Sequence, residues 1–143
     1  MKLKLVIFDC DGVMFDSKSA NQQYYNHLLD HFRYPPMSSD ELEFVHIHNV
    51  MDSTRHIFRH YPDQDLTAVD QYRQELGYTP FLPYMRMEED LVDFLKTCAP
   101  RYQLAISTNR TNTMEPILEI FHLRDYFTKV MTCLLYTSDA ADE

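Results

Sequence analysis

Long apolar runs are missing from this chain of 143 residues. No segment approaches the roughly 18 consecutive apolar residues that a membrane-spanning helix needs. The first residues lead into a short apolar run that ends at Asp9, and they have neither the length nor the small-residue cleavage site of a signal peptide. We therefore expect a cytoplasmic protein that has no membrane partner.

Cysteine is scarce, with Cys10, Cys98 and Cys133 as its only positions. Their spacing contains no CxxC pair and so does not suggest a metal knuckle, and the odd count leaves no complete disulfide framework. We expect reduced thiols, in agreement with a cytoplasmic location.

Positive charge is in deficit. The chain has 13 Lys and Arg against 22 Asp and Glu, a formal net charge of -9, and no cluster of basic residues stands out. A nucleic-acid backbone binds to patches of Lys and Arg, so this composition argues against a nucleic-acid partner. A small anionic substrate would need a local positive group. Hydrophobic residues make up 45% of the chain, which is enough for one ordinary core.

Hydrophobic periodicity divides the chain into a βα alternation and a block of helices. The predicted strands are Leu3–Phe8, Tyr102–Ile106 and Phe127–Thr132. The predicted helices run from the Asp16-Ser17 cap to before Pro35, from Ser38–Asp40 to Val45, from Asp52-Ser53 to Tyr61, from Leu66 to Leu76, from Met87 to Cys98, and around Met114–Phe121. We therefore expect an α/β fold with a Rossmann-like parallel sheet, incomplete at about three strands, in 1–14 and 85–132. An inserted α-helical cap would occupy 15–84.

An unusual carboxylate pattern follows the first predicted strand, where the residues from Leu5 read LVIFDCDGVMFDS. In an extended backbone residues two apart point to the same side, so Asp9 and Asp11 project together. Two carboxylates about 6–7 Å apart repel by roughly 2–3 kcal/mol at an effective dielectric near 20. A bound divalent cation would offset this cost, and such hard oxygen ligands favour Mg²⁺. Gly12 lets the backbone approach a ligand closely.

The segment FDCDGVMFDS resembles the first motif of the haloacid dehalogenase (HAD) superfamily, DxDGVxxDS, and LAISTN at Leu104–Asn109 resembles the second. The order of strand, aspartate motif, helical insertion, helix, strand and hydroxyl motif is also similar. The resemblance covers Leu3–Thr132. It is similar in particular to phosphoglycolate-phosphatase-like and β-phosphoglucomutase-like members, whose helical cap follows the first motif directly.

The resemblance implies roles for five residues in the Mg²⁺-dependent hydrolysis of a small phosphorylated metabolite. Asp9 would be the nucleophile that forms an aspartyl-phosphate, and Asp11 the general acid and base. Thr108 would bind the phosphoryl group together with backbone N–H groups near Gly12 and Asn109. Asp9 and Asp11 would also bind the metal.

Two further motifs of the superfamily, a lysine and a second acidic pair, normally follow the third strand, and this chain offers neither. The residues from 133 to 143, CLLYTSDAADE, resemble the in-frame translation of an adapter used to prepare sequencing libraries. We therefore expect a non-native tail and a longer natural protein, with a natural acidic terminus as the alternative. The fragment itself would be inactive or nearly so, and Leu3–Phe8 would form an exposed apolar edge.

Several alternatives stay open from the sequence alone. The same superfamily contains sugar-phosphate mutases, and a degenerate core could serve as a non-catalytic binding protein. Arg110 would either supply positive charge near the site or lie at the surface. Within the second motif, Ser107 is the less favoured choice beside Thr108 for the phosphoryl-binding hydroxyl. Other polar residues that could approach a substrate or a metal are Asn21, Arg55, Arg59, His46, His48, His56 and His60. For these the more ordinary roles are surface residues and packing in the helical block.

Overall fold

The computed structural model describes residues 4–132, and within them the fold is α/β with a parallel sheet, as predicted. The chain divides into two compact units. One contains the residues up to Asp16 and those from Arg86 onward, and we call it the sheet unit. The other is Ser17–Met85, which we call the helical unit. The expected tail at 133–143, with Cys133, lies outside the described residues.

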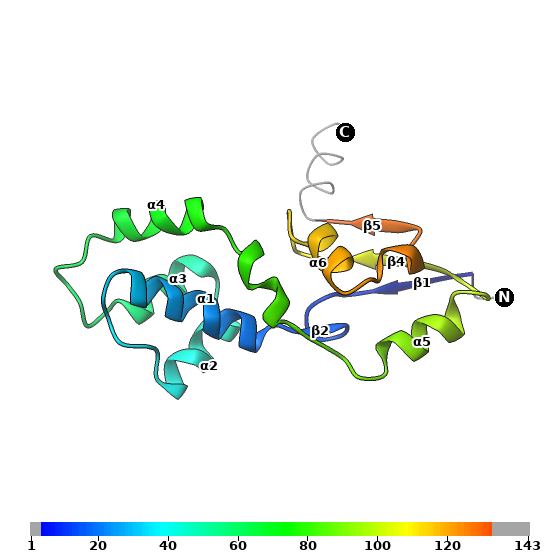
Figure 1. The fold of residues 1–143 in the computed structure, drawn as a ribbon, viewed down its shortest axis with the longest axis horizontal. Helices are drawn as coiled ribbons and strands as arrows, with labels where there is room; N and C mark the ends of the chain where they lie inside the picture. The colour runs from blue at the N-terminus through cyan, green and yellow to red at the C-terminus, as the bar shows by residue number, and fades with distance from the viewer. Residues whose placement is uncertain (1–3, 133–143) are drawn as a thin grey trace. The chain divides into compact units, whose positions relative to one another are not determined.

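Three parallel strands form the sheet, β1 (Leu5–Phe8), β4 (Gln103–Ser107) and β5 (Lys129–Met131), in the order β1-β4-β5 (Figure 1). Leu104 and Ile106 on β4 are fully buried, as expected for a central strand. Phe8 lies opposite Ile106, so β1 and β4 end almost level with each other. The residues that follow the two strands are therefore brought to the same edge of the sheet.

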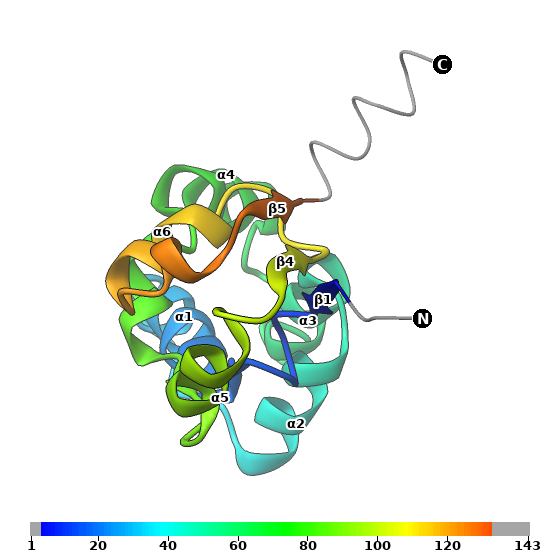
Figure 2. The same cartoon turned by 90° about the vertical axis from the view of Figure 1, so that its right-hand side faces the viewer.

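Two helices cover one side of this sheet, α5 (Leu91–Cys98) and α6 (Met114–Ile120) (Figure 2). Side chains alternate along β1, and only Phe8 is buried there, in edge-to-face contact with Phe94 and Phe127. Leu5 and Ile7 are 44% and 52% exposed. Among the described residues β1 pairs with β4 alone, so the exposed apolar edge expected from the sequence is present.

A short antiparallel ribbon was missed by the sequence analysis. It consists of β2 (Phe15–Asp16) and β3 (Arg86–Met87), whose strands lie 70 residues apart in register Asp16 to Arg86. The helix expected from Met87 accordingly begins only at Leu91, because Met87 pairs with Phe15 instead. Helical periodicity alone could not reveal this pairing, since the partner strand is distant in the sequence.

The helical unit encloses its own core of aromatic and aliphatic side chains. Its helices are α1 (Lys18–His31), α2 (Ser39–Ile47), α3 (Val50–Ile57), α4 (Leu66–Leu76) and the 3₁₀ helix η1 (Thr79–Tyr84). The buried core residues are Tyr24, Tyr25, Leu28, Leu29, Val45, Ile57, Phe58, Val69 and Phe81. No helix within residues 4–132 has the length and apolar character to cross a membrane.

Capping residues set the ends of these helices. The Glu41 N–H donates to Ser38 Oγ at the start of α2, and the Ser38 N–H donates back to Glu41 Oε1, which is a capping box. Gly77, at φ +68°, ends α4 as predicted. The predicted start of α3 at Asp52 is wrong: Asn49 accepts the Asp52 N–H at 2.8 Å, so Asn49 is the cap.

Candidate active site

The carboxyl ends of β1 and β4 border a hollow of about 370 Å³. We call it the strand-end hollow, and it is lined by Ile7, Asp9, Ser107, Thr108 and Asn109. Three of the predicted site residues, Asp9, Thr108 and Asn109, thus meet in one place although 98 residues separate Asp9 from Ser107. The parallel pairing of β1 with β4 is the cause, since it places both strand ends at one edge.

The chain turns sharply after Asp9. The Cys10 carbonyl oxygen accepts the N–H groups of Met14 and Phe15, at 3.0 and 3.1 Å, and the Gly12 N–H donates to the Phe15 carbonyl at 2.8 Å. Gly12 has φ +82°, a conformation that suits glycine, and a Cβ built there would meet no heavy atom within 4 Å. The turn therefore needs glycine for its backbone conformation, and it occupies the N–H of Gly12 itself.

Thr108 is held rigidly at the end of β4. Its N–H donates to the Met131 carbonyl at 3.0 Å, and its side chain is buried with the residue 8% exposed. The hydroxyl oxygen accepts the backbone N–H of Arg110 at 3.1 Å. Because this bond uses the oxygen as an acceptor, the hydroxyl hydrogen can be directed toward a phosphoryl oxygen in the hollow.

Arg110 joins the two strand ends. Its Nε and Nη2 donate to the two carboxylate oxygens of Asp11, at 3.0 and 2.7 Å, across 99 residues of sequence. Nη1 donates to the hydroxyl of Thr113 at 3.0 Å. The sequence left the place of Arg110 open and missed Thr113 entirely, because no motif at this spacing signals a buried hydroxyl partner. Asp11 is thus tied to the second motif through Arg110.

Cys10, between the two aspartates, is not suited to a reactive role. The residue is completely buried. Burial raises the pKa of its thiol to about 11, and the negative charge of Asp11 acts in the same direction. A thiol with so high a pKa is protonated at neutral pH, so it is a poor nucleophile. The carboxylates on either side of it are left as the reactive groups of the motif.

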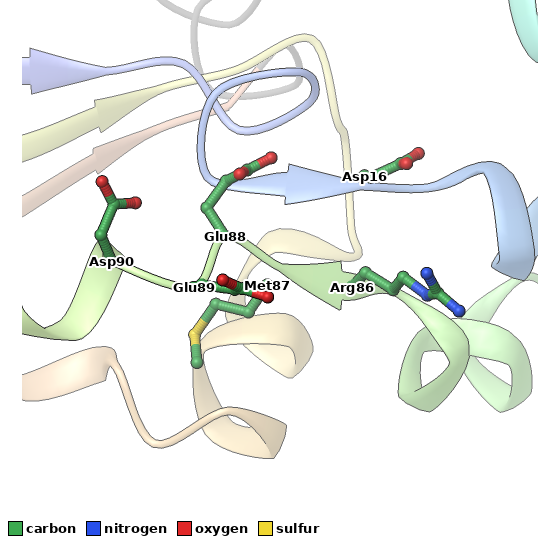
Figure 3. Close-up of a pocket in the computed structure, with 6 residues that line it drawn as sticks. All are labelled: Asp16, Arg86, Met87, Glu88, Glu89 and Asp90. Atoms are coloured by element: carbon green, nitrogen blue, oxygen red, sulfur yellow. The ribbon is translucent and has the colours of Figure 1, made fainter.

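A second hollow of about 530 Å³ lies beside the β2–β3 ribbon (Figure 3). It is lined by Asp16, Arg86, Met87, Glu88, Glu89 and Asp90. Four of these six side chains are acidic, and a phosphate dianion would be repelled by them. The smaller strand-end hollow, with its hydroxyl and amide groups, is therefore the better phosphate site.

Three of the histidines weighed as metal ligands, His46, His48 and His56, have other partners within the helical unit. His48 and His56 each stack on the ring of Phe44, with ring centroids 3.7 and 3.8 Å from it, and His46 contacts Asn21. Within residues 4–132 no three His, Cys, Asp or Glu side chains gather into a metal-binding group. These histidines pack the helices, which was the more ordinary of the two interpretations.

The other polar residues of the helical unit also have partners within it. Asn21 Oδ1 accepts the hydroxyl of Tyr78 at 2.6 Å, and Arg59 donates to Glu41 at 2.8 Å. Arg55 lies 3.7 Å from Asp52. The first two pairs link different segments of this unit, whereas Arg55 and Asp52 both lie in α3. None of these observations assigns a ligand to the unit.

Comparison with known proteins identifies relatives of both the sequence and the fold. A family model described as haloacid dehalogenase-like hydrolase matches residues 6–138. The crystal structure of a HAD-superfamily hydrolase, subfamily IA, variant 1, from Geobacter sulfurreducens is 32% identical and has a TM-score of 0.85. The alignment covers 93% of this chain and 64% of that one. The chain therefore spans less than two thirds of the length of this relative.

Two further structures share the fold at lower identity. A candidate β-phosphoglucomutase from Thermotoga maritima is 18% identical with a TM-score of 0.75, over 93% of this chain and 62% of that one. A HAD hydrolase from Bacillus subtilis, described as bound to magnesium, is 14% identical with a TM-score of 0.67, over 92% of this chain and 66% of that one. At these identities the likeness concerns the fold.

Proposed function

Because this chain belongs to the haloacid dehalogenase-like hydrolase family, we propose that the whole protein hydrolyses a small phosphate monoester in a Mg²⁺-dependent reaction. One observation supports this most directly: Asp9 and Thr108 line the same hollow at the ends of adjacent parallel strands. A nucleophilic carboxylate and a phosphoryl-binding hydroxyl are needed side by side for this chemistry. The substrate would be a small phosphorylated metabolite, and the location cytoplasmic.

The proposed reaction has two steps. In the first, a carboxylate oxygen of Asp9 forms a bond to phosphorus while the bond to the leaving oxygen breaks, and Asp11 gives that oxygen a proton. In the second, water attacks phosphorus, Asp11 takes the proton of the water, and the bond from Asp9 to phosphorus breaks. Thr108 and Asn109 would hold the phosphoryl oxygens, with Gly12 shaping the turn around them.

The residues present fit a magnesium ion. Mg²⁺ is commonly held by one or two carboxylates together with waters and substrate phosphate. Asp9 would offer a carboxylate oxygen to the ion, and Asp11 its backbone carbonyl oxygen. The fold relative from Bacillus subtilis that is described as magnesium-bound supports this choice of metal. When bound, the ion would supply Lewis-acid stabilisation of the negative charge on the phosphoryl group.

The test is Asp9→Asn in the full-length protein that contains this chain. We expect release of phosphate from a panel of small monoesters to fall by about 10³-fold or more, because the amide is not a nucleophile. Asp90→Asn is the matched control, since it removes a carboxylate from the ribbon hollow, and its activity should stay within about twofold of wild type. Undiminished phosphate release by Asp9→Asn would contradict the proposal.

A mutase is the second candidate, supported by the fold shared with the candidate β-phosphoglucomutase. Both activities begin with transfer of a phosphoryl group to the enzyme, but a mutase returns it to another oxygen of the substrate. Product analysis separates them: a phosphatase releases inorganic phosphate, whereas a mutase converts one sugar phosphate into its isomer. A protein that does neither, and whose ligand binding does not depend on Asp9, would be the non-catalytic relative.

A further inference from the structure

Arg110 is held firmly at the end of the second motif, directly after Asn109, which lines the strand-end hollow. Its side chain is only 13% exposed, and its Nη1 donates to the hydroxyl of Thr113, which is itself buried. Its backbone N–H is held by the hydroxyl of Thr108. Burial on this scale, with bonds at the backbone and at one end of the guanidinium, restricts the directions in which its other N–H groups can point. Those groups are Nε and Nη2, and both face Asp11.

Asp11 is the exchangeable member of the pair. Its side chain is 46% exposed, against 13% for Arg110, and it lies within the turn after β1 rather than in a strand. Both of its carboxylate oxygens accept from one guanidinium. A carboxylate held in this way has to leave the guanidinium before it can reach a leaving oxygen. The same planar fork of donors fits two oxygens of a phosphate equally well.

The charges around the strand-end hollow show why an arginine is needed. A phosphate dianion in the hollow would be repelled by the carboxylate of Asp9, which lines it, and Asp11 adds a second negative charge two residues further along the chain. The other basic residues of the sheet unit, within 4–16 and 86–132, are Lys4, Arg86, Lys96, Arg101, Arg124 and Lys129. None of them directly follows the carboxyl end of β1 or β4, whereas Arg110 comes three residues after Ser107.

We propose that Arg110 is an anion-binding residue whose guanidinium is occupied by Asp11 until a phosphate group takes its place. Arrival of the phosphate would then both bind the substrate and free the carboxylate of Asp11, which takes up a proton from solvent and can give it to the leaving oxygen. No covalent bond changes in this exchange, because one phosphate replaces one carboxylate at the same donors. The inference deepens the proposed function at the same site, but its test does not depend on turnover.

The test measures binding of inorganic phosphate to the chain of 143 residues by isothermal titration calorimetry, at constant ionic strength and with EDTA to remove divalent metals. We expect Arg110→Gln to weaken binding by about tenfold or more, and Arg110→Lys to recover part of the loss without the bidentate fork. Asp11→Asn should tighten binding several-fold, because it removes the internal competitor. Arg124→Gln, which breaks an exposed pair with Glu115, is the matched control and should leave binding unchanged.

The double variant Asp11→Asn with Arg110→Gln separates exchange from a general change of charge. If Asp11 acts as a competitor for Arg110, the gain from Asp11→Asn disappears once Arg110 is absent. A gain that persists in the double variant would overturn the inference, as would unchanged binding in Arg110→Gln or no saturable binding by wild type. Circular dichroism of each variant checks the fold, and Arg110→Lys and Asp11→Asn still decide the question if Arg110→Gln does not fold. Failure of phosphate release in the full-length protein would instead contradict the proposed function.

Discussion

The helical unit and the sheet unit are specified by interactions of different range. In the helical unit, caps such as the one between Ser38 and Glu41 act over three residues, and a continuous core lies between the helices. In the sheet unit, the pairing of β1 with β4 and the contact of Arg110 with Asp11 each join segments about a hundred residues apart. The chemistry of the molecule thus depends on contacts that local sequence does not encode.

The two units also differ in how they bury apolar side chains. Leu28 in the helical unit is fully buried, whereas Ile7 in the sheet unit is 52% exposed. Both are aliphatic side chains in regular secondary structure, so they provide a matched pair. The difference indicates that the helical unit closes its own core, while β1 keeps one apolar side uncovered among the described residues.

The largest effect is expected from Leu28→Ala. Loss of a fully buried leucine side chain leaves a cavity and should lower the free energy of unfolding by about 2–5 kcal/mol. Ile7→Ala should cost less than about 1 kcal/mol, because half of that side chain already contacts water. Hydrogen–deuterium exchange followed by mass spectrometry measures both, and Leu28→Ala should raise exchange mainly in peptides of Ser17–Met85. Equal costs for the two variants would contradict the difference between the units.

A smaller effect is expected at the two glycines, one in each unit. Gly12 and Gly77 have φ of +82° and +68°, and an added Cβ would meet no heavy atom within 4 Å at either position. Alanine therefore introduces backbone strain without a clash, and each substitution should destabilise the protein by about 1–3 kcal/mol. Only Gly12→Ala should also weaken binding of inorganic phosphate, because only Gly12 belongs to the turn whose backbone N–H groups are proposed to face the phosphoryl oxygens. Urea unfolding and calorimetry measure the two quantities, and a loss of phosphate binding in Gly77→Ala would contradict this expectation.

Much of the fold could be predicted where a short-range signal exists. The helix at Leu66–Leu76 was predicted with both bounds correct, because Gly77 gives a clear stop. The start of α3 was missed because Asn49, Asp52 and Ser53 are all plausible caps, and only the hydrogen bond to Asn49 decides among them. The β2–β3 ribbon could not be predicted, since its strands have two residues each and pair across the whole helical unit.

The candidate site could likewise be predicted only in part: the strand ends could be located, but not the side-chain contacts between them. Strand periodicity placed Asp9 and the second motif at the ends of two predicted strands, and the resemblance to the HAD superfamily implied the part of Thr108; Asp9 and Thr108 both line the strand-end hollow. Their catalytic roles stay predictions. The bond from Arg110 to Thr113 and the bidentate contact with Asp11 depend on side-chain directions after a turn, and no periodicity encodes those directions.

The smallest effect concerns the charge of the capping box in the helical unit. Burial alone would raise the pKa of Glu41, but hydrogen bonds from Ser38 and Arg59 outweigh it and lower the pKa below its ordinary value of 4.5. A carboxyl with a lowered folded pKa stabilises the fold above its unfolded pKa, and this contribution is lost as pH falls through the folded value.

Glu41→Gln tests this contribution, because the amide oxygen can still accept the Ser38 N–H while the charge is gone. We expect the variant to be less stable than wild type at about pH 7, and the deficit to shrink as the pH falls below about 4.5. Urea unfolding at a series of pH values measures the difference, with Glu75→Gln as the control for an exposed glutamate. A deficit that does not change with pH would mean that Glu41 stabilises α2 through its geometry alone. The capping box would then be as local in its energetics as it is in sequence, in contrast to the charge pair of Asp11 and Arg110.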